Sequence, residues 1–380
     1  MAIALGMVMM LIALGTGLGL QQAIAKKTVA LTGDIQIAPF DNNESLMTPL
    51  AFDLSEINKA SWMDSAKIRK TYAYAAKGVL LKFKDEFEGG IVRGVDRDFS
   101  WSSLTPYYVE GEFPVFGDQM SREIVLSATM ASKLGVQMGD RLTAFFQTEG
   151  QTFPRKRYFT VAAIFETGFP DFDNTLALVD LRQVQQINRW TGQQVGGVVI
   201  HLDPHVDAGP IAERIYQRIP SHLDVRTVDQ LYASIYDWIA LFDFNILIIL
   251  IIMIAVGTLN MATALLILIL ERARMVGVLK VLGATRIQIQ KIFLWNAFYI
   301  LLRGLFFGNV FGLGLLFVQW QWQWITLDPS TYFVTTVPVA LPFFLWVGLN
   351  CLVLVVALLL LWLPSLIINK IDPATVLQIR

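Results

Sequence analysis

Four long apolar runs stand out along an otherwise mixed sequence. They lie at about residues 2–22, 242–270, 293–318 and 340–363. A helix needs about 20 apolar residues to cross the hydrocarbon core of a bilayer. Because every run approaches or exceeds that length, the pattern predicts four transmembrane helices, one before and three after a long polar segment.

The first run carries no charged residue and ends before Lys26 and Lys27. A cleaved signal peptide would also be apolar. This run, however, has no basic segment ahead of it and is longer than the usual apolar core of about 7–15 residues. We therefore expect an uncleaved transmembrane helix 1 over residues 1–25.

The long segment after it, residues 26–240, combines strand-like alternation with amphipathic stretches. Strands are expected at 28–37, 79–83, 90–95, 141–146 and 158–165, and helices at 127–134, 181–190 and 210–219. This pattern predicts a large α+β domain.

The end of this domain has a helical pattern that runs into the second apolar run without Gly or Pro, from Val228 onward. One helix over Thr227–Leu270 would be about 66 Å long and would form a stalk. The alternative is two helices with a bend near Asp237 or Asp243.

Composition agrees with a membrane protein, since 54% of the residues are hydrophobic and 16% are charged, against about 25% charged in ordinary soluble domains. The segment 26–240 is acidic, with 22 Lys and Arg against 27 Asp and Glu. It gives no argument for nucleic-acid binding. The single cysteine, Cys351, excludes an internal disulfide.

Orientation follows from the connections between the runs, because Lys and Arg mark the cytoplasmic side. The connection between the second and third runs has only Glu271 as an acidic residue and five basic ones: Arg272, Arg274, Lys280, Arg286 and Lys291. Residues 319–339 contain no Lys or Arg. The sequence therefore predicts four transmembrane helices, arranged one plus three, with an extracytoplasmic α+β domain between the first and the second.

The third run contains three glycines four residues apart, Gly304, Gly308 and Gly312. Small residues at this spacing let a second helix approach closely in lipid, although glycines are also common in membrane helices without such a role. Arg303 precedes them and is costly in lipid. It either faces protein or extends to the cytoplasmic boundary, and we favour the second.

Motifs for catalysis are missing from the sequence. It has no G-x-x-x-x-G-K-[ST], G-x-G-x-x-G or G-x-S-x-G pattern. His201 and His205 are separated by Leu-Asp-Pro and lack an evident third ligand, so we expect no metal site. Asp171 and Asp173 are expected in a solvated turn. We therefore expect neither a catalytic residue nor a metal site.

The cytoplasmic connection E-R-A-R-M-V-G-V-L-K-V-L-G-A-T at 271–285 resembles the E-R-x-x-E-I-G-x-L-[RK]-A-L-G-A signature of FtsX-like ABC permeases. Met275 stands where that family usually has an acidic residue, and residues 371–380 look like its terminal D-P-x-x-x-L-R element. The matching residues, which the resemblance implies couple to an ATPase, are Glu271, Arg272, Gly277, Leu279, Lys280, Leu282, Gly283 and Ala284.

The resemblance extends into the outer domain. Residues 123–140 are similar to a stretch of the periplasmic domain of macrolide-exporter-like and lipoprotein-releasing permeases, and 159–173 favours the lipoprotein-releasing branch. We assign transmembrane helix 1 to 1–25, the domain with its stalk to 26–240, and the FtsX-like permease domain to 241–380. Its cytoplasmic coupling segment is 271–291.

The resemblance implies a non-catalytic membrane subunit of an ABC transporter of the mechanical-transmission type, in the bacterial inner membrane. It binds no cofactor itself, because ATP and Mg²⁺ belong to a cytoplasmic ATPase dimer. Further implied partners are a second permease, identical or homologous, and lipoproteins with a periplasmic carrier. The alternatives are export of a small molecule or peptide, and signalling to a cell-wall hydrolase without transport.

Lipidated cargo needs an open apolar groove, because each buried CH₂ group contributes about 0.8 kcal/mol. The first run is free of charge, and its glycines at 15, 17 and 19 would leave a notch against the second run. The alternative is that they only permit tight helix packing. Candidate groove residues are Leu18, Leu20, Phe242 and Leu247.

The orientation leads to a labelling prediction. Cysteines introduced at Ser103 and Ser330 should react with a membrane-impermeant thiol reagent in cells without an outer barrier, and a cysteine at Thr285 should react only after lysis. The measurement is labelling of each variant before and after lysis. Labelling at Thr285 in intact cells would reverse the proposed topology.

Overall fold

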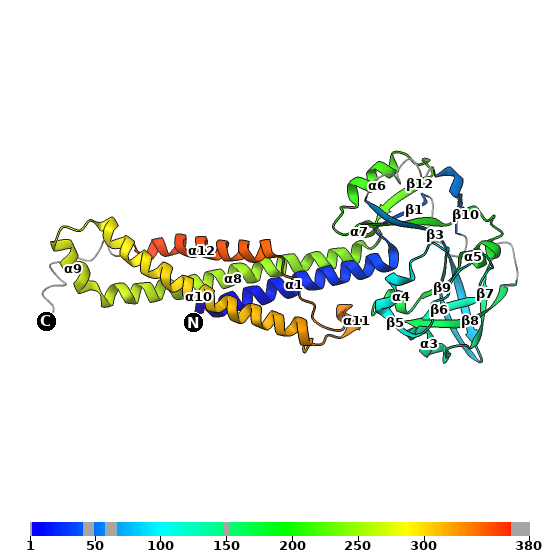
Figure 1. The fold of residues 1–380 in the computed structure, drawn as a ribbon, viewed down its shortest axis with the longest axis horizontal. Helices are drawn as coiled ribbons and strands as arrows, with labels where there is room; N and C mark the ends of the chain where they lie inside the picture. Colours follow the sequence, from blue (N-terminus) through cyan, green and yellow to red (C-terminus); the bar gives the residue numbers. More distant parts are fainter. Residues whose placement is uncertain (1, 41–48, 58–66, 148–152, 366–380) are drawn as a thin grey trace. The chain divides into compact units, whose positions relative to one another are not determined.

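The computed structural model describes residues 2–40, 49–57, 67–147 and 153–365. The chain forms two compact units (Figure 1). The membrane unit consists of Met1–Ala23, Asp237–Leu327 and Thr336–Arg380, and the domain unit of Ile24–Tyr236 and Asp328–Thr335.

The membrane unit is built from long apolar helices. Among the described residues, four helices are long and apolar enough to cross a membrane. They are α1 (Ala2–Thr32), α8 (Ala233–Glu271), α10 (Arg286–Trp322) and α12 (Phe343–Ser365). The predicted one-plus-three order is confirmed. Helices α1, α8 and α10 are longer than their apolar runs, and α12 is about as long as its run.

Helices α1 and α10 pack closely through the three glycines of α10. A β-carbon added at Gly308 would lie only 2.6 Å from the Cβ atom of Met7. Each glycine faces one residue of α1, in the pairs Gly304 with Ile3, Gly308 with Met7 and Gly312 with Leu11. The partners are four residues apart on α1, so the two helices meet along matching faces.

Helices α10 and α12 are joined by a polar cluster inside the apolar unit. Asn309 donates from Nδ2 to Oδ1 of Asn350 at 2.6 Å, and the Trp346 indole donates to Oδ1 of Asn309 at 2.6 Å. Hydrocarbon offers no other partner for these groups, so the amide pair fixes the register of the two helices.

Arg303 lies on the outer surface of α10. Its guanidinium donates to the Tyr299 hydroxyl at 2.8 Å and lies 4.4 Å from the centre of that ring. Tyr299 is one turn closer to the start of α10, which is the cytoplasmic end in the predicted topology. The side chain therefore extends in the direction that we favoured from the sequence.

The domain unit is organised around one large sheet. The strand order is β12-β1-β11-β3-β4-β9-β6-β8-β5, and β7 pairs with both β3 and β8. The pairs β4–β9 and β6–β8 are parallel and the others antiparallel. The bounds are β1 Ile35–Pro39, β3 Ile68–Phe83, β4 Glu86–Val95, β5 Tyr108–Gly111, β6 Glu123–Ser127, β7 Arg141–Phe146, β8 Arg155–Phe165, β9 Leu176–Asp180, β11 Gly197–Leu202 and β12 Leu223–Thr227.

A short second sheet and small helices complete this unit. The second sheet pairs β2 (Phe52–Asp53) with β10 (Gln194–Val195). The helices are α3 Ala128–Leu134, α4 Pro170–Asp173, α5 Leu181–Asn188, α6 Gly209–Tyr216, α7 Val228–Leu231 and α11 Pro329–Tyr332, with single 3-10 turns at Leu54–Glu56, Trp101–Ser103 and Thr105–Tyr107. The apolar side chains of α3, α5 and α6 join those of the large sheet in one core.

Helix α3 shows how local sequence sets an element. The Ser127 side chain accepts from the Met130 N–H at 3.1 Å, which caps the start of the helix. The end falls at Gly135, whose φ of 65° is readily adopted by glycine. The helix predicted at 127–134 is confirmed.

The expected strand at 28–37 is wrong in its first half. Helix α1 continues to Thr32, and the strand starts only at Ile35. The hydroxyls of Thr28 and Thr32 donate to the carbonyls of Ile24 and Thr28, respectively. Both side chains are buried. Tertiary packing therefore overrides the preference of β-branched residues for strands.

The single helix expected over Thr227–Leu270 is also wrong. Helix α7 ends at Leu231, and Tyr232, with φ −118° and ψ 43°, separates it from α8. The alternative bend near Asp237 or Asp243 does not occur either, because α8 is continuous through both residues. The Tyr232 ring packs on that of Phe172, with centroids 5.6 Å apart.

Within the domain unit, residues 328–335 are held by Lys27. The Lys27 ammonium donates to the Phe333 carbonyl at 2.7 Å and lies 5.3 Å from the centres of the Tyr107 and Phe169 rings. The rings of Phe169 and Phe333 stack at 4.7 Å. Lys27 is only 8% exposed. The rule that Lys and Arg mark the cytoplasmic side would have placed Lys27 in the cytoplasm. Lys27 carries no information about the orientation of the chain, because its ammonium is bound inside the domain unit.

Asp173 is not in a solvated turn, as the sequence suggested. It is buried and accepts from the N–H and hydroxyl of Thr167 at 3.0 and 2.7 Å and from the Gly168 N–H at 2.6 Å. Asp171, at the exposed start of α4, agrees with the prediction. The buried carboxylate holds the chain at 167–168 next to Lys27.

The glycine face of α10 gives a stability prediction. Gly308→Leu should lower the thermal stability of the purified protein in detergent, because the new side chain collides with Met7; overpacking of this kind costs about 1–3 kcal/mol. Gly314→Leu is the matched control, since nothing lies within 4 Å of a β-carbon there. Equal melting temperatures for the two variants would contradict the α1–α10 contact.

Candidate functional site

The candidate site is the connection between α8 and α10. Helix α8 ends at Glu271, and Arg272 separates it from a short helix, α9 (Ala273–Val281). Gly283 adopts φ 88°, a left-handed conformation that favours glycine. The Ala284 N–H then bonds back to the Leu279 carbonyl at 2.9 Å. This arrangement ends α9 sharply.

The start of α10 is fixed by Thr285. Its N–H donates to Oε1 of Gln288 at 2.8 Å, and its side chain accepts from the backbone of the same residue. This reciprocal capping satisfies backbone donors that a helix start leaves free. As a result, α9 is held between two defined helix ends.

One side of α9 is buried in the membrane unit. Val276 is fully buried in an apolar cluster with residues of α8, α10 and α12, including Ile269, Ile289 and Leu361. Gly277 is also buried. Leu279 and Ala284 are partly buried against the same cluster. These positions therefore anchor the segment.

The other side of α9 is exposed and apolar. The exposed fractions are 67% for Val281 and 77% for Leu282. Val278 and Met275 are exposed as well. Sequence comparison with the family signature selected Leu282 but not the other three, because the signature does not distinguish buried from exposed positions. The signal that could have identified Met275, Val278 and Val281 is their spacing of three residues, which places them on the same side of a helix.

The charges of this segment are exposed and mostly positive. Glu271, Arg272 and Arg274 are exposed, and Lys280 is half-buried. Glu271 is the only acidic residue between Asp243 and Asp328. We call the surface formed by Arg274, Met275, Val278, Val281 and Leu282 the α9 surface. It combines an apolar centre with basic neighbours, which suits a protein partner with an apolar pocket and an acidic rim.

The eight predicted coupling residues thus fall into an exposed group and a buried or half-buried group. The exposed ones are Glu271, Arg272, Leu282 and Gly283, and the buried or half-buried ones are Gly277, Leu279, Lys280 and Ala284. The similar element at 371–380 lies outside the described residues.

The expected notch in helix α1 is filled. A β-carbon at Gly15 would collide with Leu316 of α10, and one at Gly17 would lie 2.5 Å from Cδ1 of Ile246 in α8. Gly19 faces the backbone of Pro338, and the Ala340 N–H donates to the Gly15 carbonyl at 2.9 Å. These glycines therefore serve tight packing, the alternative interpretation of their spacing.

The four candidate groove residues have different environments. Leu20 is buried, Leu18 and Phe242 are half-buried, and Leu247 is 52% exposed. Close to them, Gln21 donates to Oδ1 of Asp243 at 2.8 Å and ties α1 to α8. Of the four, only Leu247 presents a large free apolar surface on this chain.

Of the two histidines set aside as metal ligands, only His201 is described with structural partners. His201 stacks on Tyr72 with ring centroids 5.9 Å apart, and burial lowers the pKa of His201 to about 4. Its Nδ1 lies 3.9 Å from Asp34. His205 is exposed. Among the described residues, no group of three His, Cys, Asp or Glu side chains is placed to hold a metal ion.

Comparison with known families matches both units. Residues 1–218 match the MacB-like periplasmic core domain, and residues 247–373 match the FtsX-like permease C-terminal domain. The periplasmic region of MacB from Actinobacillus actinomycetemcomitans is a similar solved structure, with 12% identity, a TM-score of 0.37, and coverage of 53% of this chain and 92% of that one.

Curated relatives belong to lipoprotein-releasing systems. The transmembrane protein LolC of Xylella fastidiosa is 24% identical over 67% of this chain, and LolE of Haemophilus influenzae is 25% identical over 67% of this chain. Each match covers 64% of the relative, so the chain spans less than two thirds of the length of these proteins. The chain is a multi-pass inner-membrane protein and belongs to the FtsX-like permease family, with a MacB-like periplasmic core domain between its first two membrane helices.

Proposed function

We propose that this chain is the non-catalytic membrane subunit of an ABC transporter and that the α9 surface is the docking site of its cytoplasmic ATPase. The observation that carries the proposal is the exposed apolar side of α9, with Val281 and Leu282 more than 65% exposed. An apolar patch on a cytoplasmic connection is costly in water unless a partner covers it. ATP and Mg²⁺ bind in the ATPase dimer.

The packing of α9 supports a mechanical role. Val276 and Ile289 link the segment to the helical unit through a shared apolar cluster, and the left-handed turn at Gly283 with the cap at Thr285 fixes its C-terminal end. A displacement of α9 by the ATPase would therefore move α8 and α10 with it, because close-packed interiors transmit strain. Transport then follows from helix movement in a pair of permeases, in which the second is identical or homologous.

The proposed cargo is a lipoprotein taken from the inner membrane. Two observations support it: the curated relatives are named as parts of lipoprotein-releasing systems, and α8 presents an exposed apolar side that includes Leu247, Ile251 and Leu259. A surface of this kind suits acyl chains, whose binding depends on apolar area. The released cargo passes to a periplasmic carrier.

Export of a small molecule or peptide is the second candidate. The match of residues 1–218 to the MacB-like periplasmic core domain favours it. In both candidate functions the ATPase docks on the α9 surface. The two differ in the cargo that contacts α8.

The docking site gives a prediction about assembly. Val281→Asp should reduce copurification of the ATPase and ATP turnover by at least tenfold, because it places a charge inside an apolar contact that becomes desolvated on binding. Val115→Asp is the matched control, since Val115 is 88% exposed on the domain unit. The measurement is ATP hydrolysis by the purified complex.

Full turnover and normal copurification with Val281→Asp would remove α9 as the docking site. A loss of membrane insertion would be detected separately, by the amount of variant protein in the membrane fraction.

The proposed cargo gives a crosslinking prediction. A photocrosslinking residue at Leu247 should capture lipoproteins in cells, whereas one at Leu315 should not. The two leucines are equally exposed at 52%, but Leu315 lies on α10. Captured proteins would be identified by mass spectrometry, and lipoprotein sorting would be followed after depletion of the chain.

Capture of peptides or small molecules would favour the export candidate. Unchanged lipoprotein sorting without any capture at Leu247 would favour signalling to a cell-wall hydrolase.

A further inference from the structure

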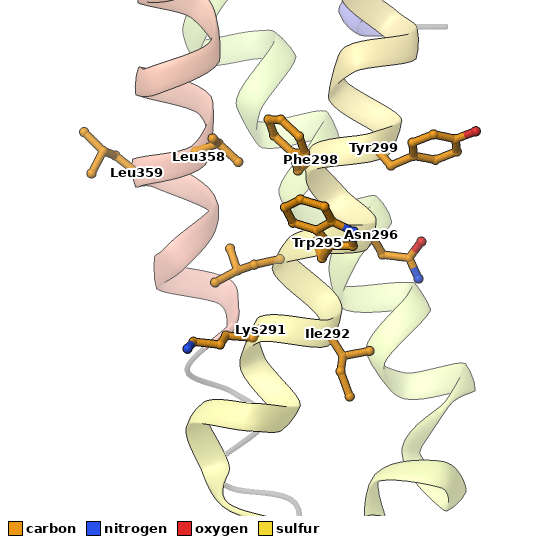
Figure 2. A pocket seen from close by; sticks show the side chains of 9 residues that line it. Lys291, Ile292, Trp295, Asn296, Phe298, Tyr299, Leu358 and Leu359 are labelled. Carbon is orange, nitrogen blue, oxygen red and sulfur yellow. The ribbon is translucent and has the colours of Figure 1, made fainter.

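A second apolar site lies on the membrane unit, away from α8 and the α9 surface. It is a crevice of about 1050 Å³ between α10 and α12 (Figure 2). The lining includes Lys291, Trp295, Phe298 and Tyr299 of α10 and Leu358 and Leu359 of α12. In Figure 2, the rings of Trp295 and Phe298 are directed to the gap between the two helices.

The crevice lies in the cytoplasmic half of the bilayer in the topology derived from the charged connections. Helix α10 begins at Arg286. The apolar part of α10 begins at residue 293, so at 1.5 Å per residue Lys291 lies about 3 Å before that boundary and Phe298 about 8 Å beyond it. One leaflet of the hydrocarbon core is about 15 Å thick. Lys291 therefore lies at the level of the lipid headgroups, and Trp295 and Phe298 lie at the level of the acyl chains.

Lys291 supplies a positive charge at the cytoplasmic end of this apolar crevice. Its side chain extends to the α12 side in Figure 2. It has no acidic partner among the described residues, and α10 contains no Asp or Glu. A charge in this position is stabilised by an anion at the membrane surface.

The other lining groups define the remaining chemistry. Trp295 is 73% and Leu359 is 65% exposed, so both present apolar surface to the hydrocarbon. Tyr299 is occupied by Arg303, which bonds to its hydroxyl and covers its ring. Lys291 therefore supplies the charge of the crevice, Asn296 adds an uncharged amide, and the other lining groups supply apolar contacts.

We propose that this crevice binds an anionic phospholipid of the cytoplasmic leaflet, with its phosphate at Lys291 and an acyl chain against Trp295 and Phe298. Basic pockets between transmembrane helices on the cytoplasmic side are known to hold anionic headgroups. A zwitterionic lipid has the same chains but no net charge, so the site should distinguish the two by headgroup charge.

The test uses the full chain reconstituted in phosphatidylcholine vesicles that contain brominated phosphatidylglycerol or brominated phosphatidylcholine. Bromine on an acyl chain quenches an indole only at close contact. The chain has 10 tryptophans, and the signal of Trp295 is obtained as the difference between the unmodified chain and Trp295→Phe.

The Trp295 component should be quenched more strongly by the brominated anionic lipid. Lys291→Gln should weaken this preference about fivefold, the factor that corresponds to about 1 kcal/mol per basic residue. Arg274→Gln is the matched control, because it removes a cytoplasmic charge outside the crevice. Its preference should stay unchanged, and added inorganic phosphate should not compete.

Equal quenching of Trp295 by both lipids, or a preference that survives Lys291→Gln, would overturn the proposal. Absence of quenching together with a crosslink between two copies through position 295 would show that a second copy of the chain occupies the crevice. Competition by inorganic phosphate would reduce the site to a simple anion site. None of these outcomes depends on the ATPase, so the result is independent of the transport function proposed above.

Discussion

The hydrocarbon core of the membrane offers no hydrogen-bonding partners, and the structure of the membrane unit follows from that constraint. Backbone groups are satisfied within long helices, and the helices associate by close packing and a few polar contacts. The glycines at 304, 308 and 312 let α1 approach α10, and Asn309 with Asn350 joins α10 to α12. Glycines on α1 repeat the principle against α8 and against residues 338–340.

This tight packing determines how the cytoplasmic connection behaves. Val276 and Gly277 are buried, while Val281 and Leu282 remain free, so α9 is fixed on one side and available on the other. The capping of α10 by Thr285 and the left-handed turn at Gly283 leave little freedom at its C-terminal end. A partner that binds the free side would act on the helices directly rather than on a flexible loop.

Two charged groups buried in the domain unit, Asp173 and Lys27, are held by specific partners. Asp173 accepts three hydrogen bonds from residues 167 and 168 and thereby positions the chain beside Lys27. Lys27 in turn bonds to the carbonyl of Phe333, in the connection between the third and fourth membrane helices. Charged groups in these places are tolerated because each is hydrogen-bonded or covered by aromatic rings. The domain therefore includes a part of the chain that is distant in sequence.

The sequence alone determined the four membrane helices, their one-plus-three order and the position of the cytoplasmic segment, because length, hydropathy and charge act locally along the chain. Helix α3 was likewise predicted, and its ends are set locally by Ser127 and Gly135, whose effects are confined to one turn. Tertiary structure decided the rest. The burial of Asp173, the continuation of α1 through Thr28 to Thr32, the break at Tyr232 and the division of α9 into a buried and an exposed side depend on contacts between distant segments. Such contacts outweigh local preferences, since a buried group takes the conformation that its neighbours allow.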